Sequence, residues 1–302
     1  MTTLSGNINE DVESFSTISL EESSTGSSLD QKIKEFIQTC KNWSLFTKEC
    51  IIKEFGSCLK HGLIYPIMLK LNPHIYGLNP LEKDIPAASE SDKIAKIILL
   101  ANSLGSSEAS ALPIAKELSR RGITHIFTVK LNQTDENPVP LSDMVSRINE
   151  IVKMFQERGY EQVKIEVIGP SLGGITGTDC ALQQKEVLPD NVEIQRVISI
   201  AARLKNVVNE DFAFFTGEDV LKEVARIYNK LCHGFNFSLY TIWGDQDKIV
   251  PKEAAHVQNN VDLETTVAGW GHVGIVFAPE TVQTVANLTE DWLNESSTSF
   301  VT

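Results

Sequence analysis

The stretch Val167-Ile168-Gly169-Pro170-Ser171-Leu172-Gly173-Gly174 decides the fold of this chain. The apolar run 163–168 leads into it and the small-residue segment 175–181 follows it, which predicts a strand, a tight turn and a helix. The turn carries the pattern G-x-S-x-G, in which a strained bend holds a serine hydroxyl out at the carboxyl end of a strand. The two glycines leave room where a side chain would collide with a neighbouring strand or helix. The pattern therefore makes Ser171 a candidate nucleophile.

Apolar and amphipathic segments alternate along the chain from Lys93 onward. Near-continuous apolar strands separated by helices are typical of a parallel sheet that is covered on both faces. We therefore predict an α/β fold with a mostly parallel sheet of about six strands, and a site beyond their carboxyl ends. The strands are expected at 94–101, 124–131, 163–168, 193–202, 237–243 and 263–268, and further helices at 109–121, 141–158 and 279–293.

The rest of the chain is expected to surround a main domain at 91–293. Residues 1–28 are rich in Ser, Thr, Glu and Asp and poor in large apolar side chains, which predicts a disordered tail, and 294–302 is expected to be flexible. Residues 29–90 are expected to form an N-terminal helical extension. The Phe-rich segment 203–236 interrupts the alternation, and it is either a cap over the site or a longer crossover.

The net charge of −13 argues against nucleic acid and anionic lipid surfaces as partners. No run approaches the length of a membrane-spanning helix, and no secretory signal is visible at the N-terminus. The apolar segment Leu63–Leu71 leaves peripheral contact with a lipid surface or a partner open.

The five cysteines match no zinc-binding pattern and no C-x-x-C motif. Free thiols in a reducing compartment are the simplest account, so we expect a cytoplasmic protein. Secretion without a signal peptide, through a specialised system that reads unfolded ends, is the alternative.

A serine nucleophile needs a base, and the base needs an acid that orients it. His272 lies in Gly-Trp-Gly-His-Val-Gly (269–274), directly after the last expected strand, where glycines on both sides let the ring swing over the edge of the sheet. Two acids, Asp245 and Asp247, follow the strand expected at 237–243. Either carboxylate is a candidate from its position, and Asp245 could instead be a turn residue.

These motifs resemble those of α/β-hydrolases, and specifically of small bacterial serine lipases and esterases. G-x-S-x-G at 169–173, D-x-I-V-P at 247–251 and G-x-G-H-x-G at 269–274 carry the resemblance, which covers about residues 93–293. The resemblance implies a catalytic triad in which the nucleophile is Ser171, the base is His272 and the acid is Asp247.

The resemblance also implies an oxyanion hole. The N–H of Leu172 is expected to supply one donor, and Leu104 occupies the position of the second donor. Asn102 and Ser103 replace the His-Gly pair that this family has before that donor, and Pro170 stands where those lipases usually have histidine. Besides these three residues, the candidates for the substrate pocket are Phe212, Phe215 and Trp270.

The expected activity is hydrolysis of a small-molecule or lipid carboxylic ester through an acyl-enzyme, without metal or cofactor. A phospholipase or thioesterase would use the same residues. A non-catalytic interaction protein on a hydrolase scaffold is the alternative from a different class, and the altered 102–105 loop motivates it. The sequence does not determine the oligomeric state.

Overall fold

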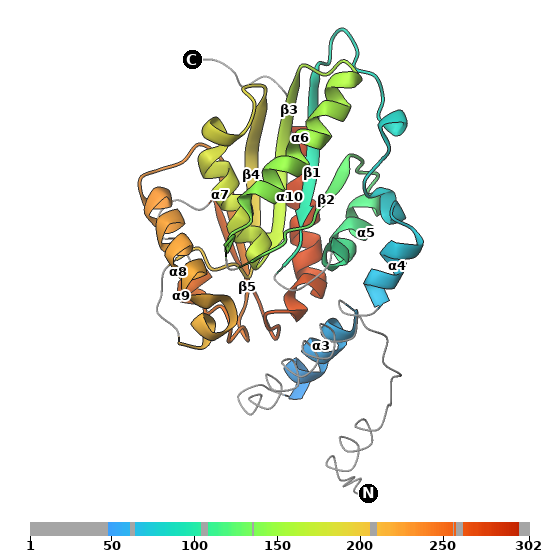
Figure 1. Ribbon diagram of the computed structural model, residues 1–302. Helices are drawn as coiled ribbons and strands as arrows, with labels where there is room; N and C mark the ends of the chain where they lie inside the picture. The colour runs from blue at the N-terminus through green and yellow to red at the C-terminus, as the bar shows by residue number, and fades with distance from the viewer. Residues whose placement is uncertain are drawn as a thin grey trace, which may run out of the picture. The chain divides into compact units, whose positions relative to one another are not determined.

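The computed structural model describes residues 48–60, 64–103, 108–134, 136–205, 210–255, 257 and 262–295. Its centre is a six-stranded sheet in the order β2-β1-β3-β4-β5-β6, in which every neighbouring pair is parallel (Figure 1). The predicted α/β fold with a six-stranded parallel sheet is therefore confirmed. The strands are β1 (Ile94–Ala101), β2 (Ile126–Val129), β3 (Gln162–Pro170), β4 (Val192–Ile200), β5 (Ser238–Gly244) and β6 (Leu263–Val267).

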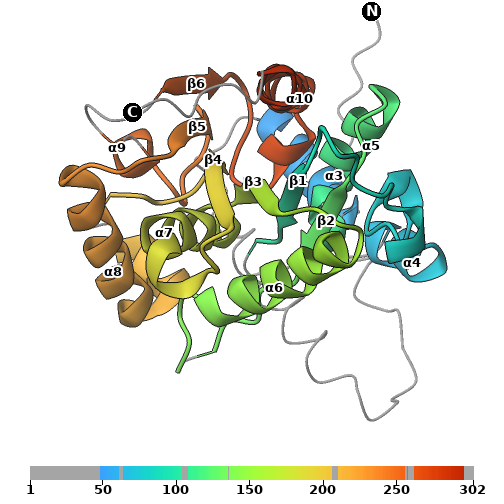
Figure 2. The same cartoon turned by 90° about the horizontal axis from the view of Figure 1, so that it is seen from above.

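Helices cover both faces of the sheet, as the view from above shows (Figure 2). Helices α6, α7 and α8 lie on one face, and α5 and α10 lie on the other. Short 3-10 helices occur at 75–77, 82–84, 108–111 and 274–277. The α-helices are α3 (Lys48–Leu59), α4 (Tyr65–Leu71), α5 (Leu112–Arg120), α6 (Leu141–Glu157), α7 (Leu172–Val187), α8 (Glu210–Cys232), α9 (Lys252–Ala255) and α10 (Pro279–Asn294).

Alternation of side chains along the strands divides the core into two layers. On β1, Ile97 and Leu99 are buried in the cluster that includes α6 and α7, whereas Ile98 and Leu100 are buried in the cluster of α5 and α10. Successive strand residues point to opposite faces, so a strand covered on both faces must be apolar at consecutive positions. This is why β1 is apolar at every position except Lys96.

Several element boundaries differ from the predicted ones for local reasons. Strand β2 begins only at Ile126, because His125 has φ +59°, a left-handed conformation that cannot continue a strand. Strand β3 continues to Pro170, which lies opposite Ile200 in the register with β4. Helix α5 starts at Leu112 rather than 109, since a 3-10 turn precedes it.

The N-terminal prediction is only partly covered by the described residues. The tail 1–28 lies outside them, as does 29–47 of the expected extension, whereas α3 and α4 form within 48–71. The described residues from Lys48 onward belong to one compact unit. Helix α8 occupies most of 203–236, and the tail beyond 295 lies outside the described residues. No helix within the described ranges is long and apolar enough to cross a membrane.

Candidate active site

Ser171 occupies the sharp turn between β3 and α7. Its φ of +50° and ψ of −116° lie in a region that residues other than glycine rarely adopt. Such a conformation costs on the order of 1–3 kcal/mol and persists only where the surroundings enforce it. Here the N–H of Ser171 donates to the carbonyl of Ile200 at 2.8 Å, which ties the turn to β4.

The turn requires glycine at 169 and 173 because there is no room for a side chain at either position. A Cβ on Gly169 would overlap the backbone of Gly173, and a Cβ on Gly173 would lie 2.8 Å from the carbonyl oxygen of Asn102. Any side chain at these positions would push the first turn of α7 away from β1 and β3. The tight turn therefore depends on both glycines.

The structure brings Ser171, His272 and Asp247 together at the carboxyl edge of the sheet. Nε2 of His272 lies 3.0 Å from Oγ of Ser171, and Nδ1 lies 2.8 Å from Oδ2 of Asp247. The other oxygen of Asp247, Oδ1, accepts hydrogen bonds from the N–H groups of Ile249 (2.9 Å) and Val250 (2.8 Å). An ionised carboxylate only accepts, so Nδ1 carries the proton and Nε2 faces the serine as the acceptor.

The charges around His272 favour its protonated form. Burial lowers the pKa of the imidazole, but the charge of Asp247, the hydrogen bond to it and the charge of Glu54 outweigh burial, so the net pKa is raised. The arrangement can accept a proton from a hydroxyl and hold the resulting imidazolium. This is the chemistry of a general base.

Asp245, the competing acid, has a different position. Its Oδ1 accepts a hydrogen bond from the N–H of Gly269 at 2.6 Å, and the N–H of Gln246 donates to the carbonyl of Trp270 at 3.2 Å. These contacts join the loop after β5 to the loop after β6. Asp247 contacts the histidine, and Asp245 holds together the two loops that carry the pair.

The chain is similar to known proteins in structure and not in sequence. No family model matches the chain, and no curated protein matches its sequence. A truncated carbohydrate esterase from gut microbiota is similar in structure, with a TM-score of 0.50 and 14% identity over 67% of this chain and 87% of that chain. The fold is that of the α/β-hydrolases.

Two further solved structures are also similar to this chain. A lipase-esterase related protein from Clostridium acetobutylicum ATCC 824 has 13% identity and a TM-score of 0.48, covering 68% of this chain and 97% of its own. An alpha/beta hydrolase enzyme from the sediment metagenome of the Mar Chica lagoon, Morocco, has 16% identity and a TM-score of 0.40, covering 70% and 94%. At 14% identity, the similarity to the carbohydrate esterase concerns the fold alone.

Of the two candidate oxyanion donors, the described residues of this α/β-hydrolase fold include Leu172 but not Leu104. Leu172 is the first residue of α7, so its N–H is one of those that no helical carbonyl can reach. It lies directly after Ser171 at the positive end of the helix. Leu104 lies in 104–107, outside the described residues.

The structure places the predicted pocket residues as follows. Asn102 is buried, and its Oδ1 accepts a hydrogen bond from the N–H of Leu131 at 2.6 Å, which ties the end of β1 to the loop after β2. Pro170 is buried at the end of β3, and Ser103 is half-buried. Trp270 is half-buried, with Nζ of Lys53 4.6 Å from its ring centre. The side chains of Phe212 and Phe215 lie outside the described residues.

Glu54 on α3 is a residue of the site that the sequence did not indicate. It is only 7% exposed, and its carboxylate accepts hydrogen bonds from the backbone of the loop that carries His272. A glutamate on a short helix gives no sequence signal of this kind, because most such residues lie on a solvated face.

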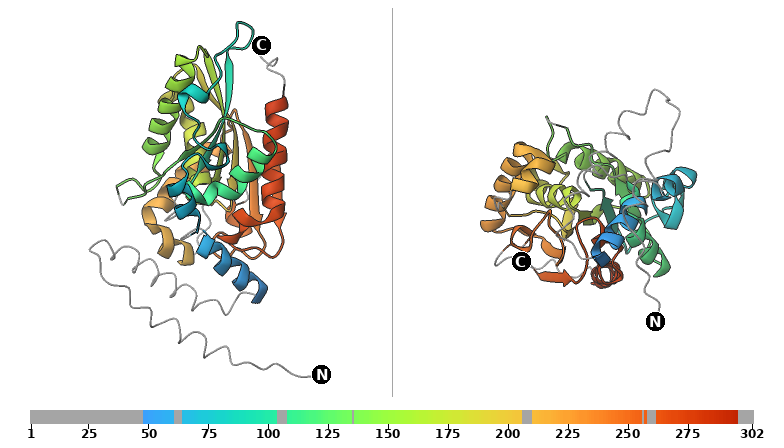
Figure 3. Two further views of the ribbon diagram at one scale, coloured as in Figure 1. Left: turned by 90° about the vertical axis from the view of Figure 1, so that its right-hand side faces the viewer. Right: turned by 90° about the horizontal axis from the view of Figure 1, so that it is seen from below.

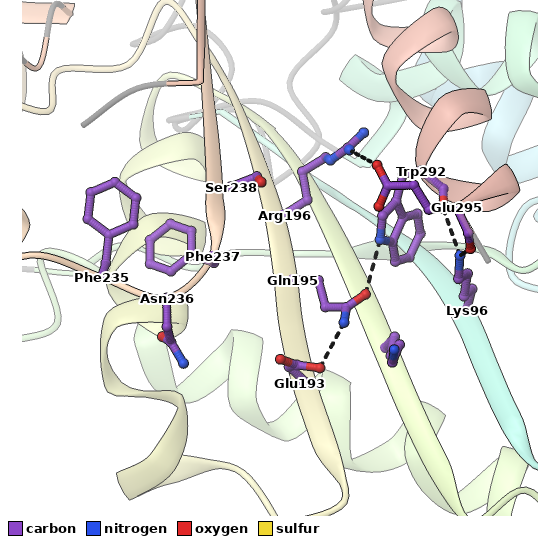
Figure 4. A pocket seen from close by; sticks show the side chains of 11 residues that line it. Lys96, Glu193, Gln195, Arg196, Phe235, Asn236, Phe237, Ser238, Trp292 and Glu295 are labelled. Atoms are coloured by element: carbon purple, nitrogen blue, oxygen red, sulfur yellow. Dashed lines mark hydrogen bonds and ion pairs between the residues drawn. The ribbon is translucent and has the colours of Figure 1, made fainter. Parts of the chain in front are cut away.

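A hollow of about 370 Å³ lies at the opposite end of the sheet, by the amino ends of the strands (Figure 4). Nζ of Lys96 donates to the carbonyls of Trp292 (2.7 Å) and Glu295 (2.8 Å), and Arg196 pairs with the Glu295 carboxylate at 3.0 Å. These cations bind the carboxyl end of α10. The hollow is separate from the candidate site, because it lies by the amino ends of the strands and the site lies by their carboxyl ends. Across the described ranges, no group of three His, Cys, Asp or Glu side chains could hold a metal ion.

Proposed function

We propose that this protein is a serine hydrolase that cleaves carboxylic esters through an acyl-enzyme. The observation that carries the proposal is the chain of contacts from Ser171 Oγ to His272 Nε2 (3.0 Å) and from His272 Nδ1 to Asp247 Oδ2 (2.8 Å). A serine hydroxyl is a weak nucleophile on its own, and this arrangement supplies the base and the group that orients it.

Acylation proceeds by attack of the serine on the ester. Nε2 of His272 takes the proton of Ser171 Oγ as the oxygen bonds to the carbonyl carbon, giving a tetrahedral intermediate and an imidazolium. The imidazolium then donates its proton to the leaving alkoxide oxygen, the carbon–oxygen bond breaks and the alcohol departs. Asp247 keeps the imidazole in the required tautomer and stabilises its charge.

Deacylation repeats these steps with water as the nucleophile. His272 takes a proton from water, the hydroxide attacks the acyl carbon, and the proton returns to Ser171 as the acid leaves. The N–H of Leu172 is proposed to bind the oxyanion in both intermediates. A single donor of this kind contributes about 3–4 kcal/mol to transition-state stabilisation in comparable enzymes. Leu104 remains the proposed second donor.

Replacing Ser171 by Ala tests the assignment directly. The variant is expected to lose both hydrolysis of p-nitrophenyl acetate and covalent labelling by a fluorophosphonate probe. Ser89→Ala, at an exposed serine, is the matched control and should retain both. If the wild-type protein is not labelled, the alternative of a non-catalytic interaction protein on this fold gains support, and the hydrolase proposal fails.

Exposed apolar side chains favour a lipid ester as the substrate. On α3, Ile52 and Phe55 are 71% and 56% exposed, and on α4, Ile67 and Leu71 are 50% and 80% exposed. Helix α3 also carries Glu54, which binds the loop of His272, so the part of this apolar surface that lies on α3 borders the candidate site. Apolar surface of this kind binds lipid interfaces when it is exposed on a helix.

Vesicle assays separate lipid esters from small soluble ones. Because the chain carries a net charge of −13, zwitterionic phosphatidylcholine vesicles are the suitable surface. Release of fatty acid that falls in Phe55→Ser, while p-nitrophenyl acetate hydrolysis is retained, would support a phospholipase. A marked preference for acetyl esters, with no activity on vesicles or long acyl chains, would contradict a lipid substrate. Acyl thioesters complete the substrate panel, since a thioesterase would use the same triad.

A further inference from the structure

Glu54 joins helix α3 to the backbone on both sides of His272. Its Oε1 accepts hydrogen bonds from the N–H groups of Gly271 (3.1 Å) and Gly274 (2.8 Å), and its Oε2 accepts one from Val273 (3.0 Å). Burying a carboxylate costs several kcal/mol unless donors fill its acceptor positions. All three of these partners are donors, which matches the ionised form of the side chain.

The glycines around His272 make room for this carboxylate. A Cβ on Gly271 would lie 2.9 Å from Cδ of Glu54, and a Cβ on Gly274 would overlap Oε1. Neither glycine has a positive φ, whereas Gly269 does. Two glycines of the histidine loop thus serve close contact with α3, and not the free swing of the ring that the sequence suggested.

A second contact from α3 holds the start of the same loop. Nζ of Lys53 donates to the carbonyl of Gly269 at 3.2 Å and lies 4.6 Å from the ring centre of Trp270. Figure 1 shows α3 beneath the carboxyl ends of the strands, and from below it lies beside the start of α10 (Figure 3). Lys53 and Glu54, which are adjacent on α3, therefore bind the loop 269–274 at its start and at its end.

We propose that Glu54 is a positioning residue for His272, an inference that rests on the triad mechanism proposed above. The carboxylate fixes the loop 269–274 so that the imidazole stays between Ser171 and Asp247. Its negative charge also stabilises the imidazolium that forms when Ser171 loses its proton. Helix α3, which precedes the first strand of the sheet, is then part of the catalytic apparatus and not an appendage.

The charged groups near His272 agree with this role. The loop after β5 contributes Asp247, α3 contributes Glu54, and both charges raise the pKa of His272 against the effect of burial. Burial and the charge of Asp247 raise the pKa of Glu54 itself, and the N–H groups of Gly274 and Val273 and the charge of His272 offset only part of that rise. Lys53 and Asp245 bind Gly269, at the start of the loop.

The substitution Glu54→Gln tests the proposal, because it keeps the size of the side chain and removes its charge. The amide presents an N–H₂ group to backbone donors, so the loop loses at least one hydrogen bond. We expect kcat to fall at least about tenfold with little change in KM, the order of effect that supporting residues have on the group they orient. The acid limb of the pH profile of kcat/KM, and the NMR titration of His272, should both move to lower pH.

Two further variants make the result specific. Glu166→Gln removes another fully buried carboxylate, which lies on β3 and accepts a hydrogen bond from Thr289 of α10, and it should leave the pH profile of kcat/KM as in the wild type. Glu54→Asp keeps the charge on a shorter side chain. It should keep the acid limb close to the wild-type position even though kcat falls, and it carries the test if Glu54→Gln does not fold.

The outcomes separate this inference from the proposed function. If Glu54→Gln matches Glu166→Gln in kcat and in the NMR titration of His272, while wild-type Ser171 reacts with the fluorophosphonate probe, the positioning role is wrong and the hydrolase proposal stands. If wild-type Ser171 does not react, the hydrolase proposal fails, and the NMR titration still shows whether Glu54 sets the protonation of His272.

Discussion

Asp247 and His272 are 25 residues apart in the chain, and Oδ2 of the aspartate lies 2.8 Å from Nδ1 of the histidine. The remaining oxygen of Asp247 accepts two backbone N–H groups, from Ile249 and Val250. These two hydrogen bonds therefore fix the orientation of the carboxylate that contacts the imidazole. This relationship links the loop after β5 to the loop after β6 and underlies the predictions below.

Replacing Asp247 by Asn should nearly abolish turnover. The amide offers an N–H₂ group to the imidazole or to the backbone donors, so Nδ1 no longer holds the proton and Nε2 no longer accepts one from Ser171. A loss of about 10⁴-fold in kcat is expected from the equivalent change in a serine protease. Steady-state kinetics with p-nitrophenyl acetate measures it. Asp245→Asn is the matched control, and an equal loss there would contradict the assignment of Asp247 as the acid.

The activity should rise with pH through the titration of His272. The base must be neutral to take the serine proton, and the pKa of His272 is raised from the ordinary value of 6.5. Activity is therefore expected to be lost as pH falls through a midpoint above 6.5. The pH profile of kcat/KM in the free enzyme reports this midpoint. A midpoint below 6.5 would show that burial, and not the two carboxylates, dominates at His272.

Gly169→Ala should prevent the turn at Ser171 from forming. The added Cβ would overlap the backbone of Gly173, and neither backbone segment can move without separating α7 from the sheet. We expect a loss of several kcal/mol in the free energy of unfolding, in the upper range for single substitutions.

Gly56→Ala on α3 is the control for Gly169→Ala, because a Cβ there meets nothing within 4 Å. It should be stabilising by about 0.5–1 kcal/mol, as glycine is disfavoured inside helices. Urea denaturation compares the two, and equal stabilities would refute the steric argument.

Glu166 should make the protein less stable as the pH rises toward neutrality. Burial raises the pKa of this carboxyl to about 7 from 4.5, against the hydrogen bond from Thr289 and the charge of Arg196. As the pH rises, Glu166 therefore loses its proton at a lower pH in the unfolded chain than in the folded one. The free energy of unfolding falls by about 3 kcal/mol in total between pH 4.5 and about pH 7. Glu166→Gln should remove this part of the pH dependence.

Urea denaturation at pH 5 and pH 7 measures the effect of Glu166. The exposed Glu150, whose carboxylate pairs with Arg147 at 3.0 Å, provides the control substitution Glu150→Gln. It should keep the wild-type difference between the two pH values. A Glu166→Gln variant that also keeps this difference would show that Glu166 is ionised in the folded protein throughout.

The local sequence accounted for most of the sheet. Strand β1 covers the residues predicted for it, 94–101, because an eight-residue segment that is apolar except at Lys96 and covered on both faces has few other solutions. The second strand is shorter than predicted, because the left-handed backbone of His125 cannot be read from an apolar segment. The apolar composition therefore predicts that a strand forms here, whereas the φ angle of His125 determines that it begins at Ile126.

The sequence alone also placed Ser171, Asp247 and His272 after the third, fifth and sixth strands, and parallel strands bring their carboxyl ends to one edge of a sheet. Position alone leaves Asp245 and Asp247 as alternatives, and the family resemblance favours Asp247. In the tertiary structure Asp247 contacts the imidazole, whereas Asp245 binds Gly269. Glu54 gave no signal at all. Its role depends on contacts with residues more than 200 positions away, and no local pattern encodes a distance of that kind. Periodicity and short motifs act over a few residues, whereas the partner of a buried charge is set by the way distant segments pack.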